Sequence, residues 1–229
     1  MRTSGVIAGS LALAALLAGC GIAGPLQEDT ASYDVTEKVT ALQVETDAGD
    51  IEVIESDRQG IHVTERITWR KNKPVTSHGT RGGTLTLAFT CPGGWMGDAG
   101  CDVGYQVEIP RGLRVKAVSD SGKVTLQDLS GDVEANSDSG TIEAEGLTGK
   151  QVATKTDSGD ITLTFTAQPG KVETKTDSGT SVVRVPQGPY KVALTTDSGN
   201  KKIDTVHDPA APRSITMSSD SGDVEVLGS

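Results

Sequence analysis

Short runs in which every second residue is apolar cover most of the chain after residue 40. Such alternation, in runs bounded by glycine, is typical of β-strands with one buried face. Between residues 35 and 113 the runs are irregular, and the glycine-rich, basic stretch 70–83 is a predicted loop. The strands predicted in this part contain Val44; Ile51 and Val53; Ile61, Val63, Ile67 and Trp69; Leu85, Leu87 and Phe89; and Tyr105, Val107 and Ile109.

From residue 115 onward the alternation becomes regular. The residues expected to face inward are slim or β-branched, which suits a narrow core. Polar neighbours such as Lys123, Glu134 and Lys171 are expected to face outward. The expected core residues are Val124, Leu126, Val133, Ala135, Ile142, Ala144, Ile161, Leu163, Phe165, Val183, Val185, Val224 and Val226.

A four-residue unit, Ser/Thr-Asp-Ser-Gly, separates these runs and occurs six times. Its aspartates are 18, 19, 20, 20 and 23 residues apart, and Thr46–Gly49 is a degenerate early copy. Further glycines fall about halfway between the units. Near-constant spacing is the mark of a repeat architecture. The predicted repeat turns contain Asp47 and Gly49, Asp120 and Gly122, Asp138 and Gly140, Asp157 and Gly159, Asp177 and Gly179, Asp197 and Gly199, and Asp220 and Gly222.

The unit predicts a tight corner. Glycine accepts a positive φ, and Asp and Ser side chains bond to nearby backbone N–H groups. Two all-β architectures fit: a β-solenoid with two short strands per repeat of 18–20 residues, and an antiparallel meander or sandwich. A solenoid encloses its own core, whereas a meander needs a cover. Stacking brings the corner aspartates to about 4.8 Å, at a cost under about 1 kcal/mol each in water. We therefore expect the solenoid and keep the meander as the alternative.

The N-terminus has the pattern of an export signal. Arg2 precedes an apolar run over 6–17, which is shorter than the roughly 20 residues of a membrane-spanning helix. The run ends in Leu17-Ala18-Gly19-Cys20, which resembles the bacterial lipobox. That resemblance implies a signal peptide at 1–19, and a diacylated Cys20 that anchors the mature chain to the outer side of the cell membrane. An ordinary signal peptide or a spanning anchor is the alternative.

The chain has three cysteines. If Cys20 carries lipid, Cys91 and Cys101 remain as a pair, and a disulfide between them closes an 11-residue loop in an oxidising compartment. A zinc site is disfavoured, because no histidine lies near the two thiols. The loop contains Trp95 and Met96, interpreted either as an exposed contact for a partner or as a cap on the β core.

The domain organisation follows from these patterns. Residues 20–34 lack periodicity and are predicted to be a flexible tether. Residues 35–229 are predicted to form one β-repeat domain, with an irregular part at 35–113 and regular repeats at 114–229.

The Ser/Thr-Asp-Ser-Gly units at 119–122, 137–140, 156–159, 176–179, 196–199 and 219–222, each near a Val/Ile strand, resemble the bacterial putative-adhesin family of β-strand-repeat surface proteins. The likeness covers roughly residues 40–229. It implies a β-helix-like fold and export to the cell envelope, and it supplies no catalytic residues.

The composition and the absence of known motifs argue against several classes of function. A net charge of −10 argues against a nucleic-acid partner, and 3% aromatic residues leave too few rings for an aromatic-lined sugar cleft. The chain has no Gly-x-Ser-x-Gly elbow and no phosphate-binding fingerprint. An identical aspartate in every repeat does not suit catalysis, which needs one differentiated site. We expect no cofactor, although calcium on the corner carboxylates stays a hypothesis.

The function predicted first is a non-enzymatic, lipid-anchored envelope protein that serves adhesion or scaffolding through flat Thr/Lys/Glu faces that include Lys155 and Lys175. Its partner is a cell-surface, cell-wall or membrane protein or polymer. The alternatives are an envelope sensor that binds a membrane signalling partner through the 91–101 loop, and a polysaccharide-acting β-helix enzyme. A basic stretch is expected to face anionic polymer or lipid headgroups: Arg66, Arg70, Lys71, Lys73 and Arg81.

Overall fold

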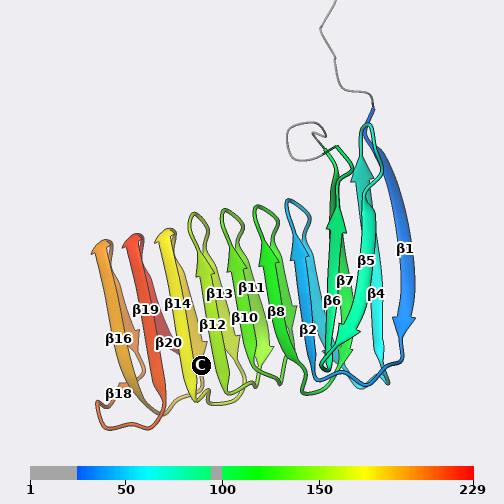
Figure 1. The fold of residues 1–229 in the computed structure, drawn as a ribbon. Helices are drawn as coiled ribbons and strands as arrows, with labels where there is room; N and C mark the ends of the chain where they lie inside the picture. Colours follow the sequence, from blue (N-terminus) through cyan, green and yellow to red (C-terminus); the bar gives the residue numbers. More distant parts are fainter. Residues whose placement is uncertain (1–24, 94–99) are drawn as a thin grey trace, which may run out of the picture.

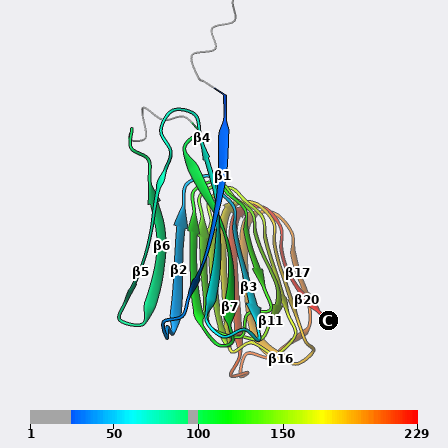
Figure 2. The same cartoon turned by 90° about the vertical axis from the view of Figure 1, so that its right-hand side faces the viewer.

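The computed structural model describes residues 25–93 and 100–229, and all regular structure in these residues is β (Figure 1). Two ten-stranded sheets face each other across one core (Figure 2). Within these described ranges there is no helix long and apolar enough to cross a bilayer.

Two-strand coils, stacked side by side, build most of the molecule. The first strand of a coil lies in one sheet, called sheet B here, and the second lies in the opposite sheet A. The coils are β2 (Ala41–Thr46) with β3 (Ile51–Ser56), β8 (Arg114–Ser119) with β9 (Val124–Gln127), β10 (Val133–Ser137) with β11 (Ile142–Leu147), β12 (Gln151–Thr156) with β13 (Ile161–Phe165), β14 (Lys171–Ser178) with β15 (Ser181–Val185), β16 (Pro189–Ser198) with β17 (Lys201–Asp204), and β19 (Ser214–Ser221) with β20 (Val224–Gly228).

Neighbouring coils pair in parallel with equivalent residues side by side. Val133, for example, is the register partner of Val115 on one side and of Val152 on the other. This parallel stacking confirms the predicted β-solenoid. The alternative of an antiparallel meander is wrong for the repeats.

The core follows the predicted alternation. All thirteen residues expected inside are at most 4% exposed, whereas Lys123, Glu134 and Lys171 are exposed. Burying a Val or Leu side chain contributes about 1.5–3 kcal/mol, so the stacked aliphatic rows supply most of the stabilisation. At the C-terminal end of the stack the buried Tyr190 donates its hydroxyl to the carbonyl oxygen of Pro186 at 2.9 Å.

Each quartet glycine packs directly against the corner of the neighbouring coil. A Cβ atom added to Gly140 would lie 2.0 Å from the carbonyl oxygen of Gly122, and the corresponding distances for the six quartets are 1.8–2.3 Å. Of these six glycines only Gly222 has a positive φ, at +150°. Our expectation that the corners need glycine for its left-handed backbone is therefore wrong in general. Glycine is needed because the next coil occupies the space of a side chain.

The first residue of each quartet places a hydroxyl group in or at the edge of the core. Ser119 accepts a hydrogen bond from the N–H of Gly122 at 2.8 Å, which closes the turn as expected. Thr156 instead donates to the carbonyl oxygen of Gly140, one coil back, at 3.2 Å. The same kind of donation recurs from Thr176, Thr196 and Ser219. Because an unpaired buried polar group costs about 1–3 kcal/mol, these bonds favour Ser or Thr at this position.

The chain is ordered from before the predicted domain boundary. Strand β1 (Gln27–Val35) pairs antiparallel with β4 (Ile61–Trp69), which pairs antiparallel with β7 (Asp102–Pro110). The expected flexible tether is thus wrong for residues 27–34. Tyr33 donates its hydroxyl to the buried Glu65 at 2.8 Å, and these partners are distant in sequence. Local periodicity contains no trace of such a contact.

A strand also occupies most of the predicted loop at 70–83. Strand β5 (Val75–Arg81) forms a hairpin with β6 (Thr84–Thr90). Its turn, Gly82-Gly83, has φ values of +59° and +77°, as a type I′ turn requires. The side chains of β5 are almost all exposed, so no apolar alternation marks the strand. Only residues 70–74 connect without strand structure.

The last two coils stack in the reverse of their sequence order. Strand β19 lies between β14 and β16, and β20 lies between β15 and β17. Residues 205–213 return the chain past β16, and β18 (Val206–His207) pairs with the start of that strand. At the opposite end β6 and β7 lie inside the earlier strands β5 and β4. Apart from the two-residue strand β18, the strands at both ends therefore precede their inner neighbours in sequence.

A single methyl group at a corner glycine should destabilise the stack of coils. Gly140→Ala is expected to lower the free energy of unfolding by about 3 kcal/mol, because the new Cβ overlaps the Gly122 carbonyl oxygen and the coils must separate. Gly79→Ala is the control, since a Cβ added there meets nothing within 4 Å, and it should change stability by less than about 0.5 kcal/mol. Chemical denaturation followed by circular dichroism measures both. Equal stability of the two variants would contradict the argument.

Candidate binding surface

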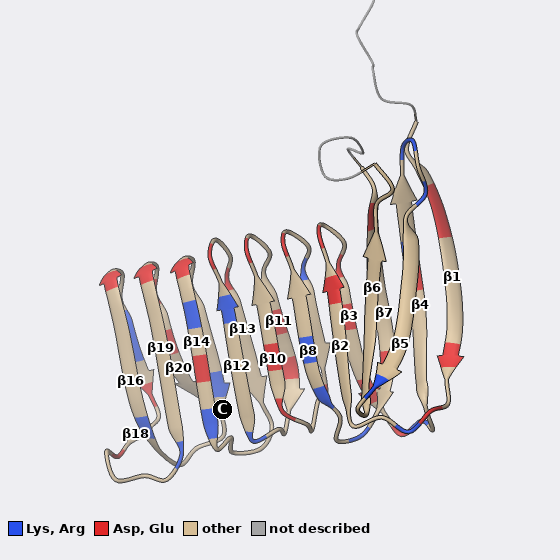
Figure 3. Ribbon diagram, in the orientation of Figure 1, with Lys and Arg blue, Asp and Glu red and all other residues tan. Residues whose placement is uncertain are grey.

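One carboxylate from every repeat corner lies along the same edge of the solenoid (Figure 3). Adjacent coils are about 4.8 Å apart, so each of these side chains has like-charged neighbours. We call this row the aspartate ridge. In spatial order it consists of Asp47, Asp120, Asp138, Asp157, Asp177, Asp220 and Asp197.

At one end of the ridge, the charged form of the Asp47 carboxyl is disfavoured. The pKa of its carboxyl is raised, first because partial burial disfavours the charged form, and then because Asp120 and Asp102 repel it. Elsewhere a lysine offsets the repulsion: Lys155 is ion-paired with Asp157 at 2.9 Å.

A second set of carboxylates, one residue after the glycine, binds the backbone of the adjacent coil. Asp160 accepts the N–H of Thr180 at 2.8 Å. These carboxylates hold neighbouring coils together, whereas the sequence interpretation expected the quartet aspartates to bond to backbone N–H groups within their own turn. The repeated Gly-Asp pair was the available signal. The equivalent bonds run to Asp50 from the N–H of Lys123 and to Asp223 from the N–H of Asn200.

The carboxylates do not gather into a metal site. The residues that the structure describes include no group of three or more His, Cys, Asp or Glu side chains placed to hold a metal ion. The calcium hypothesis gains no support from the ridge.

The outer face of sheet B carries polar side chains in rows along the solenoid. Lys116 is ion-paired with its register partner Glu134 at 2.9 Å, and Lys155 lies beside Lys175. A shallow hollow of 360 Å³ crosses the face where short alanine side chains lie among longer ones. Its lining includes Ala41, Arg114, Lys116, Gln151, Ala153 and Lys171.

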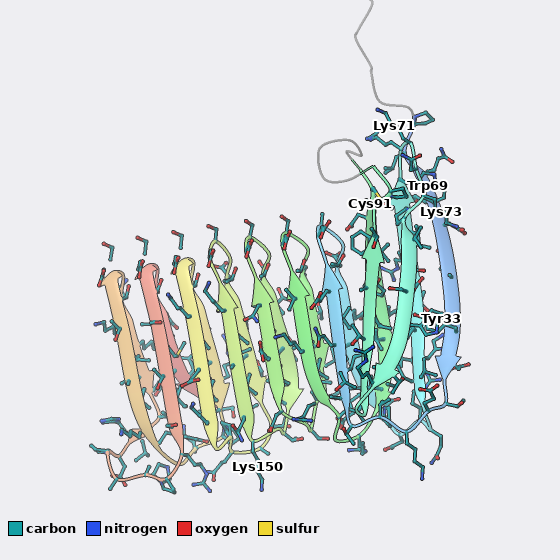
Figure 4. The ribbon with its side chains drawn as sticks, in the orientation of Figure 1. Tyr33, Trp69, Lys71, Lys73, Cys91 and Lys150 are labelled. Carbon is teal, nitrogen blue, oxygen red and sulfur yellow. A yellow bond between two sulfur atoms is a disulfide. The ribbon has the colours of Figure 1, made fainter. Side chains whose placement is uncertain are left out.

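The basic residues of 66–81 do not form one patch. Arg66 is on β4, and Arg81 ends β5 beside the Gly82 turn. Figure 4 shows Lys71 and Lys73 at the other end, on the connection between β4 and β5. Lys73 donates to Asp29, and its Nζ lies 5.3 Å from the ring centroid of Trp69.

Cys91 and Cys101 form a disulfide with a Cα–Cα distance of 6.0 Å, which ties the end of β6 to the start of β7. Trp95 and Met96, considered as a partner contact, lie outside the described residues, as does Cys20.

Each of the three histidines has a separate structural partner. His62 is 3.0 Å from Asp34, the ring of His78 stacks on Tyr33, and the Nδ1 of His207 accepts the N–H of Val192 at 3.2 Å. These partnerships give no sign of a nucleophilic triad.

Fold and repeat corners together define an all-β, solenoid-like repeat protein. The chain belongs to the Toastrack DUF4097 family, whose pattern matches residues 39–180 and, in a second match, 105–227. This match confirms the predicted resemblance to the putative-adhesin family of β-strand-repeat domains.

Solved structures add a likeness of fold alone. One, described as a putative cell adhesion protein from Clostridium sporogenes, is 11% identical, covers 89% of this chain and 100% of its own, and has a TM-score of 0.53. Another, described as a putative adhesin from Bacteroides fragilis, is 12% identical with a TM-score of 0.48, and the matched region covers 88% of this chain and 97% of its own. No curated protein matches the chain.

Because the pKa of Asp47 is raised, replacing this residue by asparagine should stabilise the folded chain at neutral pH but not at acid pH. A folded-state pKa above the unfolded value contributes stability below the unfolded pKa, near 3.9, and loses it as the pH rises through the folded pKa. Asp47→Asn should therefore raise the free energy of unfolding at neutral pH, by less than about 1 kcal/mol because solvent screens this group, and should match the parent chain at acid pH. Thermal unfolding across the pH range measures this.

Asp197→Asn is the control. Asp47 and Asp197 both end the ridge, but Asp47 is also repelled by Asp102, which is not a ridge aspartate. A gain from Asp47→Asn that persists in acid, or a larger gain from Asp197→Asn, would contradict the electrostatic account.

Proposed function

We propose that the chain is an exported, lipid-anchored protein of the bacterial envelope that acts by binding, in adhesion or scaffolding, and not by catalysis. The outer face of sheet B supports this proposal most directly. Its polar side chains repeat in register from coil to coil, as Lys155 and Lys175 do. A periodic, nearly flat surface fits an extended or repetitive partner.

Similarity and chemistry support the same proposal. The Clostridium sporogenes structure, described as a putative cell adhesion protein, shares the fold of this chain and supports a role in binding. Each ridge aspartate repeats the position of its neighbours, whereas catalysis requires one site unlike the rest. The sensor and polysaccharide-acting alternatives have no comparable observation among residues 25–93 and 100–229.

The lipid anchor is tested at Cys20. In a bacterial host fed an alkyne fatty acid, the parent chain should be labelled and retained with membranes. Cys20→Ser should abolish labelling, because it removes the thiol that would carry the acyl chains. Cys101→Ser with Cys91→Ser is the control and should keep the label. Labelling that survives Cys20→Ser would contradict the anchor.

The binding face is tested with isolated cell envelopes. The double change Lys116→Ala with Lys171→Ala, at the hollow of sheet B, should reduce co-sedimentation of the Cys20→Ser chain about tenfold, because it removes two charges from the proposed face. The control is Lys123→Ala, which removes a similar ion pair, with Glu143, from the opposite sheet. Equal loss in both variants, or none in either, would contradict the proposed face.

A further inference from the structure

Exposed apolar and basic side chains gather where the described chain begins. Strand β1 starts at Gln27, which is the register partner of Trp69, and the β4–β5 connection lies at the same end of the sheet. Figure 4 shows Trp69, Lys71 and Lys73 at this end, which rises beyond the corners of the repeat coils. We call this group the tip: Leu26, Trp69, Arg70, Lys71, Lys73 and Val75.

The tip presents apolar surface to solvent. Leu26 is 46% exposed and Val75 is 62% exposed, and they are two of the four large hydrophobic residues found exposed within the described ranges. Trp69 packs partly against the core, with the Lys73 ammonium over its ring. Aliphatic, Trp and Lys/Arg side chains together are the composition of proteins that lie at a membrane–water interface.

The position of the tip agrees with this composition. Leu26 follows Cys20 by six residues, and an extended chain covers at most about 3.6 Å per residue. A lipid on Cys20 would therefore hold the tip within about 20 Å of the acyl chains. This step rests on the proposed lipid anchor.

The rest of the same edge is unsuited to contact with lipid. The aspartate ridge runs along it, but the strands that bear the tip extend past the ridge (Figure 3). Charges are screened over about 8 Å at physiological ionic strength, so a short offset greatly weakens repulsion between the ridge and an anionic bilayer. The tip can reach the headgroups while the ridge stays in water.

We infer that the tip is a second, protein-based contact with the membrane. Leu26, Trp69 and Val75 enter the interfacial region, and Arg70 and Lys71 lie near anionic lipid headgroups. The acyl chains give the chain its affinity for the membrane. The tip fixes the orientation of the solenoid on it.

Vesicle binding by the unlipidated chain isolates the tip. Residues 20–229 with Cys20→Ser retain all of the described structure. This protein should float with vesicles that contain about one quarter phosphatidylglycerol in phosphatidylcholine, and less with phosphatidylcholine alone. Adding Lys71→Glu and Val75→Ser should reduce the bound fraction about tenfold, because the pair of changes reverses a basic charge near the headgroups and removes an apolar contact.

The other end of the solenoid provides a matched control. Lys201→Glu with Ile203→Ser also reverses one exposed lysine and removes one exposed aliphatic side chain, which in Ile203 is 44% exposed. This variant should bind vesicles like the parent. Circular dichroism checks that both variants fold. Equal loss of binding in the two variants would overturn the inference.

A local probe gives a second measurement. In the Cys20→Ser chain, an environment-sensitive dye on Val75→Cys should shift to the blue when vesicles are added, and the same dye on Ile203→Cys should not. No shift at position 75 overturns the inference even if the charge variants misfold. Binding to soluble dextran sulfate but not to vesicles would also overturn it, in favour of a polyanion partner.

The outcomes separate this inference from the proposed anchor. Fatty-acid labelling at Cys20, with no vesicle binding by the Cys20→Ser chain, would keep the anchor and reject the tip. Vesicle binding without labelling would reject the anchor and keep the tip.

Discussion

The approach of each corner glycine to the carbonyl oxygen of the next coil sets the geometry of the repeats. A Cβ atom on Gly159 would lie 2.3 Å from the oxygen of Gly140, so the coils reach strand spacing only if this position has no side chain. At that spacing equivalent residues stand side by side. Quartet hydroxyls then reach the glycine carbonyl one coil back, as from Thr176 to Gly159 at 3.1 Å, and the aspartates line up on one edge. One steric requirement produces both the hydroxyl bonds and the aspartate ridge.

The regular coils could be predicted from sequence because their signals are local, an alternation and a corner. The reason for glycine could not, since the oxygen that excludes a side chain belongs to another coil. The order of the last two coils could not be predicted either, because the quartets that end at Gly199 and Gly222 have the same sequence pattern. Only the longer interval of 23 residues between Asp197 and Asp220 marked the return past β16.

Buried carboxylates explain why the N-terminal part was harder to interpret. Glu55 is 6% exposed and accepts hydrogen bonds from the backbone N–H of Gly112 and Ser130 at 3.1 and 2.9 Å. Glu65 is 2% exposed and receives the hydroxyl of Tyr33. A pattern of apolar and polar residues assigns such side chains to the solvent. Their partners lie tens of residues away in sequence. Strand β1, which contributes Tyr33 to one of these contacts, could therefore not be predicted from local sequence patterns.

The orientation of the strands connects the two proposed surfaces. If the tip touches the bilayer, the strands stand upright and the solenoid axis lies parallel to the membrane, because the tip occupies one end of the strands (Figure 1). In that orientation the outer face of sheet B is perpendicular to the membrane surface. A chain held in this way meets long partners that run along the membrane, and successive coils offer them equivalent contacts. Within the proposed function, such an arrangement suits scaffolding along the membrane better than reaching outward to a distant cell.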